Sequence, residues 1–373
     1  MNETIKPVVI AVGDNQTPIW GMTNAERIRR IAVKQGLVHG WGDGPRLLVD
    51  ARYAFDPPLL RHVARHPGSV VVHDGRPVLA HVPHHGTCKI VAEAMAAGGA
   101  LPEGLELETI VHEEGFTLYN DELRKREQPF LIRLMPENVR KIERASYYAA
   151  YKGVTDVLTK YLWPEWALVL TRLAARTGVT PNMVTAVGAA LCLLATWLFW
   201  HGRYWEGMAA GLVFMVLDTV DGKLARCTIT SSGWGEFFDH GIDLVHPPFW
   251  WWAWGVGLSA WGLALSDELF AAVLAAIVGG YVLQRLIEGA FIKRFGMHIH
   301  IWERVDSDFR LITARRNPNM VILFAATLLQ RPDIGLIAVA GWTLVSLLFH
   351  FVRLLQAEAR RRVGLTVVSW LSA

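Results

Sequence analysis

Residues 218–243, DTVDGKLARCTITSSGWGEFFDHGID, place two pairs of aspartates in apolar sequence of membrane-spanning length. Asp218 and Asp221 form the first pair, Asp239 and Asp243 form the second, and a short polar segment joins them. Separations of three and four residues put each pair on one face of its own helix. An ionised side chain at the centre of a bilayer costs about 2.5 to 3.5 kcal/mol. We therefore expect two facing helices that aim all four carboxylates at a bound cation.

Oxygen ligands of this kind suit Mg²⁺, Mn²⁺ or Ca²⁺ better than thiophilic metals. The alternative is that each carboxylate is neutralised separately or faces a water-filled cavity. The arrangement in two helical pairs favours the metal site.

The same stretch resembles the signature DxxDGxxAR(x8)GxxxDxxxD of the CDP-alcohol phosphotransferase (CDP-alcohol phosphatidyltransferase) family and matches all eight fixed positions. The resemblance implies a membrane transferase of phospholipid biosynthesis. Such an enzyme moves a phosphoalcohol group from a CDP-alcohol to a second alcohol and releases CMP. It implies two Mg²⁺ or Mn²⁺ ions held by Asp218, Asp221, Asp239 and Asp243, and a homodimer. Asp243 would also be the general base, and the sequence does not separate this role from that of a ligand.

The resemblance extends to a Pro-Asn-x-x-Thr motif at the start of the first apolar stretch, which Pro181, Asn182 and Thr185 match. Small residues in the signature leave room for a nucleotide, and its arginine supplies a fixed positive charge. The residues expected to bind the CDP-alcohol are Asn182, Thr185, Asp218, Asp221, Gly222, Ala225, Arg226 and Gly235.

A second basic cluster follows the fourth apolar stretch and includes Arg310, Arg315 and Arg316. In the resembled family, arginines in this region bind the phosphate of the acceptor, for which paired guanidinium groups are suited. Membrane topology alone would also place basic residues there, so both interpretations stay open. Arg285 and Glu288, three residues apart, are expected to pair with each other.

The long apolar stretches of the chain are confined to its second half. Residues 1 to about 145 have ordinary soluble composition, and six apolar stretches follow, at 182–201, 205–222, 236–262, 268–292, 318–331 and 334–355. Their lengths predict an α-helical bundle of six transmembrane helices. Basic residues concentrate in alternate connections, which predicts cytoplasmic termini, and we expect an integral protein of the bacterial inner membrane.

Two broader features limit the class of protein. The opening residues lack the continuous apolar core of a cleavable signal peptide. The net charge of +3 is too small to indicate nucleic acid as a partner.

The third apolar stretch has two unusual features. Pro247 and Pro248 are expected to break or kink its helix one turn past Asp243. The tryptophans that follow are expected to pack against lipid or at the membrane interface, where amphipathic rings are favoured. They are Trp250, Trp251, Trp252 and Trp254.

The first 140 residues alternate short strands with helices, which predicts an α/β sandwich. We expect strands at 7–13 and 46–50, helices at 24–35 (capped by Asn24) and 57–65, and a hairpin of 69–73 with 77–82.

This order looks like a shortened sugar-nucleotide cytidylyltransferase domain. However, the segment Gly13-Asp14-Asn15-Gln16-Thr17-Pro18 lacks the glycine-rich loop and basic residues that hold a triphosphate. We expect a non-catalytic cytoplasmic domain over 1–140, an amphipathic juxtamembrane linker over 141–180 and the membrane domain over 181–373.

His81, His84, His85 and Cys88 have the spacing of metal ligands. No second ligand group is near them in sequence, and the paired cysteines of common zinc sites are missing. We therefore interpret them as a polar loop.

Two other functions stay open. A divalent-cation transporter could use the aspartates, although no inverted repeat is visible and a cation path does not need the glycine and arginine positions of the signature. A bifunctional enzyme would also form the CDP-alcohol from CTP in the N-terminal domain. The sequence identifies neither the donor alcohol nor the acceptor alcohol.

Overall fold

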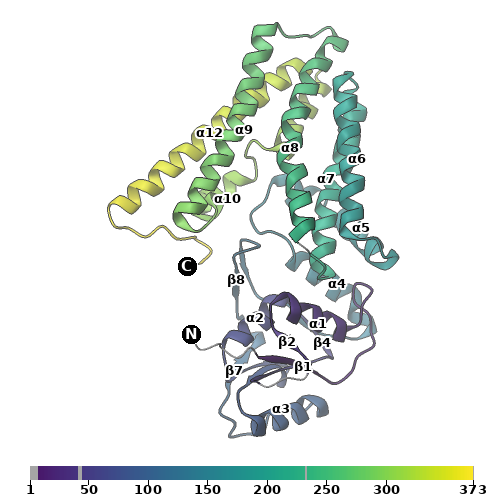
Figure 1. Ribbon diagram of the computed structural model, residues 1–373, viewed down its shortest axis with the longest axis vertical. Helices are drawn as coiled ribbons and strands as arrows, with labels where there is room; N and C mark the ends of the chain where they lie inside the picture. The colour runs from purple at the N-terminus through teal and green to yellow at the C-terminus, as the bar shows by residue number, and fades with distance from the viewer. Residues whose placement is uncertain (1–6, 41–43, 232, 373) are drawn as a thin grey trace. The chain divides into compact units, whose positions relative to one another are not determined.

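The computed structural model describes residues 7–40, 44–231 and 233–372, with the side chains of residues 234 and 236–240 outside the description. The chain divides into two compact units. The first comprises Met1–Tyr151, Arg172–Gly178 and Lys223–Ser231, and the second comprises Lys152–Thr171, Val179–Gly222 and Ser232–Ala373. Strands and short helices make up most of the first unit, and long helices make up the second (Figure 1).

The first unit contains a six-stranded sheet in the order β2-β1-β3-β6-β5-β7. Strand β6 is antiparallel to β3 and β5, whereas β1 pairs in parallel with β2 and β3, and β5 with β7. Parallel neighbours cannot be joined by a tight turn, so helices cross between several of them. The strands are β1 (Val8–Val12), β2 (Val38–His39), β3 (Arg46–Asp50), β5 (Ser69–His73), β6 (Arg76–Val82) and β7 (Glu108–Val111).

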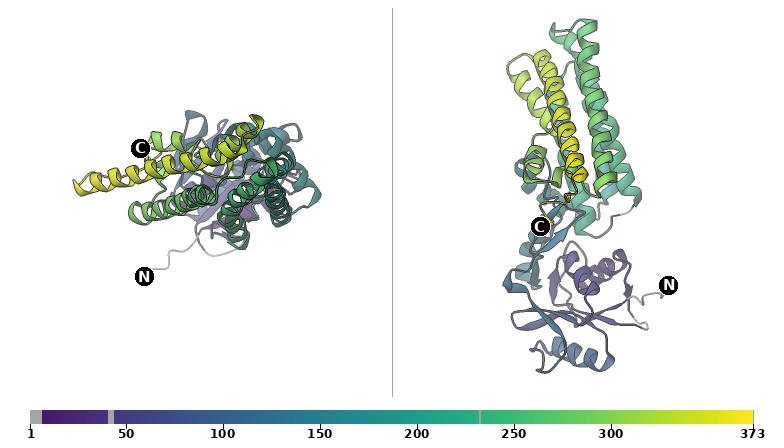
Figure 2. Two further views of the ribbon diagram at one scale, coloured as in Figure 1. Left: turned by 90° about the horizontal axis from the view of Figure 1, so that it is seen from above. Right: turned by 90° about the vertical axis from the view of Figure 1, so that its left-hand side faces the viewer.

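Helices cover both faces of this sheet (Figure 2). Successive side chains of a strand point to opposite faces, so Leu47 packs on one side and Leu48 on the other. Ile28 of α1 joins the Leu47 side together with α2, and Val91 of α3 joins the Leu48 side. The helices are α1 (Asn24–Lys34), α2 (Pro57–Arg65) and α3 (His85–Ala97). The predicted α/β sandwich is confirmed, including its hairpin of β5 and β6.

The predicted cap of α1 was wrong by one residue. Thr23 is the N-cap, and its side chain accepts a hydrogen bond from the N–H of Glu26 at 3.3 Å. Asn24 is buried, and its amide donates to the carbonyls of Ala51 and Tyr53 at 2.8 Å. The Asn24 side chain therefore links α1 to the segment that follows β3.

The prediction of a polar loop over His81 to Cys88 was also wrong. His81 is buried in β6, where its Nδ1 lies 3.1 Å from the carbonyl oxygen of Val63. His85 and Cys88 belong to α3, and Cys88 packs in the core beneath that helix. The strand passes into the helix with only two residues between them, so no loop of that length exists.

Two smaller ladders and one helix complete the first unit. They are β4 (Tyr53–Phe55) with β10 (Leu131–Arg133), β8 (Leu118–Asn120) with β9 (Lys125–Glu127), and α4 (Val139–Ala149). Lys223 Nζ and Arg226 Nε both donate to the carbonyl of Ala150, the C-cap of α4, at 2.9 and 3.1 Å. Positive charges at this end complement the helix dipole.

The second unit is helical, and each of the six predicted apolar stretches falls on a helix. Three helices in the described part of the chain, α6, α9 and α12, are long and apolar enough to cross a membrane. That the chain crosses the membrane six times stays a prediction. Helix α6 packs against α8, and α9 packs against α12. The helices are α5 (Pro164–Thr177), which the two units share, α6 (Pro181–Trp200), α7 (Tyr204–Cys227), α8 (Gly233–Gly257), α9 (Asp267–Phe295), α10 (Arg304–Arg310), α11 (Arg316–Leu328) and α12 (Pro332–Arg362).

Helix α8 is not broken by its prolines, because both Pro247 and Pro248 lie inside it. A proline has no N–H, so Pro248 cannot donate to the carbonyl of Leu244 one turn earlier. The hydroxyl of Tyr281, from α9, donates to that carbonyl at 3.1 Å. A neighbouring helix therefore supplies the missing donor.

The tryptophan run does not form a lipid-facing belt. Trp250 and Trp254 are fully buried, and Trp251 is nearly so, whereas Trp252 is exposed. The indole of Trp250 donates to the carbonyl of Cys192 on α6 at 3.2 Å. Three of these rings are therefore buried in the core, and those of Trp250 and Trp254 contact other helices, which corrects the prediction of interface packing.

Candidate functional site

Helices α7 and α8 bring the first and last aspartates of the signature to one guanidinium group. Arg316, the first residue of α11, donates from Nη2 to Asp218 Oδ2 at 2.7 Å and from Nη1 to Asp243 Oδ1 at 2.8 Å. The structure therefore brings Asp218 and Asp243 to the same guanidinium group. Arg316, which was predicted to bind the acceptor, contacts the aspartates directly.

Asp221 is held differently from Asp218. It is buried, and its Oδ2 accepts a hydrogen bond from the hydroxyl of Thr185 on α6 at 2.6 Å. The same hydroxyl lies 3.1 Å from the carbonyl oxygen of Pro181. Thr185 was predicted to bind the CDP-alcohol, and its observed contact orients a carboxylate. The threonine of the Pro-Asn-x-x-Thr motif thus positions Asp221.

The donor set fits a hard divalent cation. Carboxylate oxygens of Asp218 and Asp243 flank a single guanidinium, and such oxygens are the ligands that Mg²⁺ prefers. The single positive charge of Arg316 faces the two negative charges of Asp218 and Asp243. The two carboxylates can therefore attract a further positive charge. The side chain of Asp243 is 45% exposed, against 19% for Asp218, so Asp243 is the more accessible to a substrate.

The other predicted donor-binding residues are spread along three helices. Asp239 belongs to α8, but its side chain lies outside the described residues, as do its contacts. Asn182 is exposed in the first turn of α6, and Gly222 and Gly235 are half-buried. Ala225 and Arg226 end α7 within the first unit, where Arg226 contacts Ala150.

Arg315 takes part in a second charged network, centred on Glu288 of α9. Glu288 Oε1 lies 2.9 Å from Arg285 Nη2, 2.6 Å from Arg315 Nη2 and 3.3 Å from His300 Nε2. The predicted pairing of Arg285 with Glu288 is confirmed. Burial lowers the pKa of His300 well below its ordinary value, although Glu288 acts in the opposite direction. The neutral imidazole of His300 can therefore accept a hydrogen bond from Arg315, whose Nη2 lies 3.1 Å from His300 Nε2.

Arg310, the third residue predicted to bind the acceptor substrate, interacts electrostatically with a buried acid, Asp156. Burial alone would raise the pKa of Asp156, but the charge of Arg310 and hydrogen bonds from Thr159 and Asn317 hold it below its ordinary value. Asn317 Nδ2 donates to Asp156 Oδ1 at 3.1 Å. Asp156 is therefore an ionised partner of the basic cluster.

Sequence reasoning missed Asp156 and His300 as members of these networks. Asp156 is a lone acid before α5, and His300 sits in a short 3₁₀ turn (Ile299–Ile301) without a motif. The signal for Glu288 was its spacing from Arg285 on one helix face. No comparable local signal exists for partners that come from other helices.

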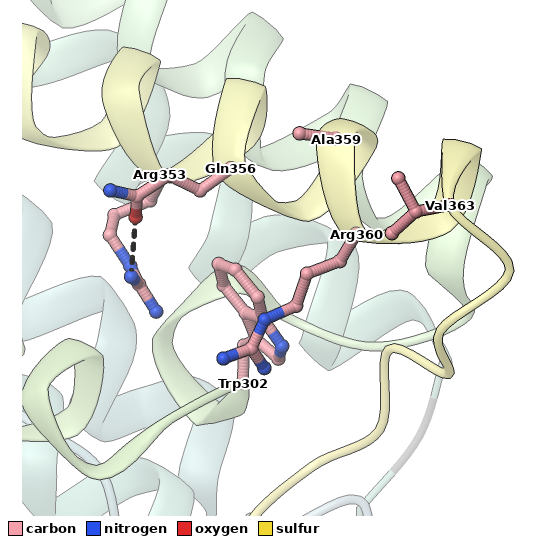
Figure 3. A pocket seen from close by; sticks show the side chains of 6 residues that line it. All are labelled: Trp302, Arg353, Gln356, Ala359, Arg360 and Val363. Carbon is pink, nitrogen blue, oxygen red and sulfur yellow. Dashed lines mark hydrogen bonds between the residues drawn. The ribbon is translucent and has the colours of Figure 1, made fainter.

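A separate cavity of about 480 Å³ lies near the end of α12 and is shown in Figure 3. Arg353 donates to Gln356 Oε1 at 2.6 Å, and its guanidinium carbon lies 4.1 Å from the ring centre of Trp302. Arg353 also pairs with Glu303 and Asp306, each at 2.6 Å. None of the predicted site residues lines this cavity. The residues that line it are Trp302, Arg353, Gln356, Ala359, Arg360 and Val363.

Comparison with known proteins agrees with the signature. Residues 178–340 match the CDP-alcohol phosphatidyltransferase family, a range that contains α6 to α11 and every aspartate of the motif. Residues 178–340 belong to this family. The family generally uses divalent metal ions, in keeping with the oxygen donors of Asp218 and Asp243.

Individual members of the CDP-alcohol phosphatidyltransferase family are similar over different shares of the chain. The archaetidylinositol phosphate synthase of Pyrococcus horikoshii is 27% identical over 196 residues, 51% of this chain and 89% of that protein. Cholinephosphotransferase 1 of Gallus gallus is 33% identical over 129 residues, 31% of this chain. The phosphatidylinositol phosphate synthase of Streptomyces avermitilis is 36% identical over 93 residues, 24% of this chain. The matched regions span only 36% and 38% of these last two proteins.

The contact of Thr185 with Asp221 yields a first prediction. Thr185→Val should weaken divalent-metal binding about 10- to 100-fold, because a hydrogen-bonded partner orients a metal-binding carboxylate. Titration of Mn²⁺ into the purified protein measures the affinity. Thr196→Val is the matched control, since Thr196 lies on the same helix and its hydroxyl donates to the carbonyl of Cys192. Equal affinities in the two variants would show that Thr185 does not support the ligand.

Proposed function

We propose that the chain is an integral-membrane transferase that moves a phosphoalcohol group from a CDP-alcohol to an alcohol acceptor and releases CMP. The convergence of Asp218 and Asp243 on Arg316 is the observation that carries this proposal. It brings together oxygen ligands from both halves of a family signature. Such a set suits the binding of a diphosphate through divalent cations.

Asp218, Asp221, Asp239 and Asp243 would hold two Mg²⁺ or Mn²⁺ ions. Bound ions of this kind would offset the charge of the diphosphate and of the departing CMP. Asp243 accepts the proton of the attacking hydroxyl, a role supported by its greater exposure. Thr185 orients Asp221, and small residues at Gly222 and Ala225 let the nucleotide approach α7.

Arg316 keeps Asp218 and Asp243 at a fixed separation before substrates bind. Its planar guanidinium offers two nitrogens in one geometry, which a lysine could not do. It also lies above the ring of Phe214, 4.8 Å from the ring centre, so its position is set by packing as well as by charge.

Release of CMP tests the proposed activity directly. Purified full-length protein in proteoliposomes is supplied with Mg²⁺, a radiolabelled CDP-alcohol and candidate acceptors, and CMP is measured. CMP release that requires both a divalent ion and an acceptor supports the transferase. Divalent-ion flux across the vesicle wall without CMP release would instead identify a transporter.

The acceptor class is the next question, because relatives are named for different products. All three arginines predicted to bind a phosphate have an acid near them: Arg316 pairs with Asp218 and Asp243, Arg315 with Glu288, and Arg310 acts on Asp156. A phosphate on the acceptor would have to compete with these acids. Among the described residues Arg315 pairs with a single carboxylate, that of Glu288, and it is therefore the residue to test first.

Arg315→Ala should raise the KM for a phosphorylated acceptor by about 10- to 150-fold, the equivalent of about 1.5 to 3 kcal/mol for a hydrogen bond to a charged group. The KM for the donor should change little. Arg203→Ala is the control, because Arg203 is exposed and pairs with the equally exposed Glu206 in the same unit. For an uncharged lipid alcohol the same change should leave the acceptor KM unaltered. An unchanged KM for a proven phosphorylated acceptor would contradict the assignment.

The remaining organisation is proposed on sequence grounds. Residues 1–140 form a cytoplasmic, non-catalytic domain related to cytidylyltransferases, residues 141–180 form a linker, and residues 181–373 form a membrane domain of six spans. Both termini are cytoplasmic, the protein resides in the bacterial inner membrane, and it is a homodimer. CTP-dependent release of pyrophosphate by the full-length protein would contradict a non-catalytic N-terminal domain and would identify a bifunctional enzyme.

A further inference from the structure

Two histidines and a glutamate meet at the carboxyl ends of two neighbouring strands in the first unit. Strands β5 and β7 are parallel, with Val72 opposite Val111. The next residue of each strand is a histidine, His73 at the end of β5 and His112 directly after β7. Glu113 follows in the same 3₁₀ turn (His112–Glu114). One ligand atom from each of these three side chains lies within 4.8 Å of the other two.

Contacts around these side chains resemble the outer shell of a metal site. His112 Nε2 lies 2.7 Å from the carbonyl oxygen of Pro129, a contact in which Nε2 carries the proton and Nδ1 keeps its lone pair. Metal-binding histidines usually donate their second ring nitrogen in this way. Glu113 Oε1 accepts the backbone N–H of Asp74 at 2.9 Å. Both side chains are therefore oriented by the main chain.

His73 completes the group. Its Nδ1 is buried and lies 2.5 Å from Glu113 Oε1. Its ring meets the ring of His112 edge to face, with centres 5.2 Å apart, and packs in the same manner against Tyr53. The packing on two sides fixes the direction of the imidazole before any ligand arrives.

The charges nearby separate this group from the cluster of Glu288, His300 and His350, whose ligand atoms are equally close. In that cluster the guanidinium groups of Arg285 and Arg315 already contact Glu288, and they would repel a divalent cation. Beside His73 lies a further acid, Asp74, whose Oδ2 is 3.8 Å from Nε2. A cation is therefore favoured at His73 and disfavoured at Glu288.

We propose that His73, His112 and Glu113 bind one divalent transition-metal ion, with Zn²⁺ the best match. Two imidazoles and a carboxylate are common Zn²⁺ ligands, and a fourth position stays available to water. Imidazole nitrogen disfavours Mg²⁺, which selects oxygen, so this site differs in metal from the aspartate signature. The ion ties the turn after β7, the last strand of the sheet, to the end of β5.

Metal binding by the full-length protein in detergent tests this site. The protein is stripped with a chelator, supplied with excess Mg²⁺ to fill the aspartate site, and titrated with Zn²⁺ or with Co²⁺, whose visible absorption reports nitrogen ligands. We expect about one Zn²⁺ per chain with an apparent Kd below about 1 µM. His73→Ala and Glu113→Gln should each weaken binding by about 100-fold or more.

His66→Ala is the matched control, because it removes a histidine of the same unit that is exposed and whose Nδ1 contacts its own helix at His62. It should bind Zn²⁺ as the unmodified protein does. Glu113 has a 43% exposed side chain, so Glu113→Gln is expected to fold even if a histidine variant does not. Zn²⁺ affinity unchanged in Glu113→Gln, or weak binding by the unmodified protein, would overturn the proposal. Neither result depends on transferase activity.

Discussion

Asp218→Asn is expected to lower kcat/KM by about 100-fold or more, because divalent ions supply several kcal/mol of charge stabilisation in phosphoryl chemistry and the amide cannot hold them. The substitution keeps the shape of the side chain and removes its charge. It also leaves Arg316 with Asp243 as its remaining acidic partner in the bridge. Mn²⁺ titration of the variant, alongside its rate of CMP release, measures both losses. The same outcome is expected for Asp221→Asn and Asp239→Asn.

Asp267→Asn is the control for this experiment. Asp267 is an exposed acid in the first turn of α9, in the same unit, and its substitution should leave both metal affinity and rate unchanged. Normal metal affinity in inactive variants of all three signature aspartates would contradict their assignment as ligands. Unfolding temperature, measured in parallel, separates that result from simple loss of the fold.

Asp243→Asn should abolish turnover and leave CDP-alcohol binding largely intact. A general base acts on the acceptor hydroxyl and contributes little to the affinity for the donor, so kcat falls while the donor Kd stays nearly constant. We expect a loss of about 100- to 10,000-fold in kcat, the usual range for removal of an acid or base. Single-turnover rates and equilibrium binding of a CDP-alcohol measure the two quantities separately.

The comparison of Asp243→Asn with Asp218→Asn decides between the two roles of Asp243. A fall in donor affinity as large as the fall in kcat would mean that Asp243 is chiefly a metal ligand. The exposure of its carboxylate favours the role of base, because a proton acceptor must reach a second substrate.

The spacing of the aspartates was enough to predict that α7 and α8 face one another. Separations of three and four residues place each pair of aspartates on one helix face. Because burying a charge in a membrane is costly, that face is expected to bind a cation. Four strands of the first unit, β1, β3, β5 and β6, were also predictable, because their apolar residues and the turn at Asp74-Gly75 are local signals, whereas β2, β7 and the two small ladders were not predicted. These features depend on neighbours in sequence.

The partners of the site residues could not be predicted in the same way. Arg316 lies far along the chain from Asp218, and the sequence gives no rule that places one guanidinium between two particular aspartates. The burial of Trp250 depends on Cys192 from another helix, so composition alone pointed to the lipid. His73 and His112 became neighbours through strand pairing, whereas the histidines close together in sequence, His81 to His85, did not form a ligand group among the described residues.

The two prolines inside α8 have a chemical consequence beside Asp243. Pro247 cannot donate to the carbonyl of Asp243, just as Pro248 cannot donate to that of Leu244, which Tyr281 serves. The same residue thus offers a carboxylate and a main-chain oxygen outside the helical ladder. Substitution of Asp243 removes its carboxylate but leaves its main-chain oxygen in place. Pro247→Ala restores an amide N–H that can donate to the carbonyl of Asp243, so this exchange tests the main-chain oxygen without changing any aspartate side chain.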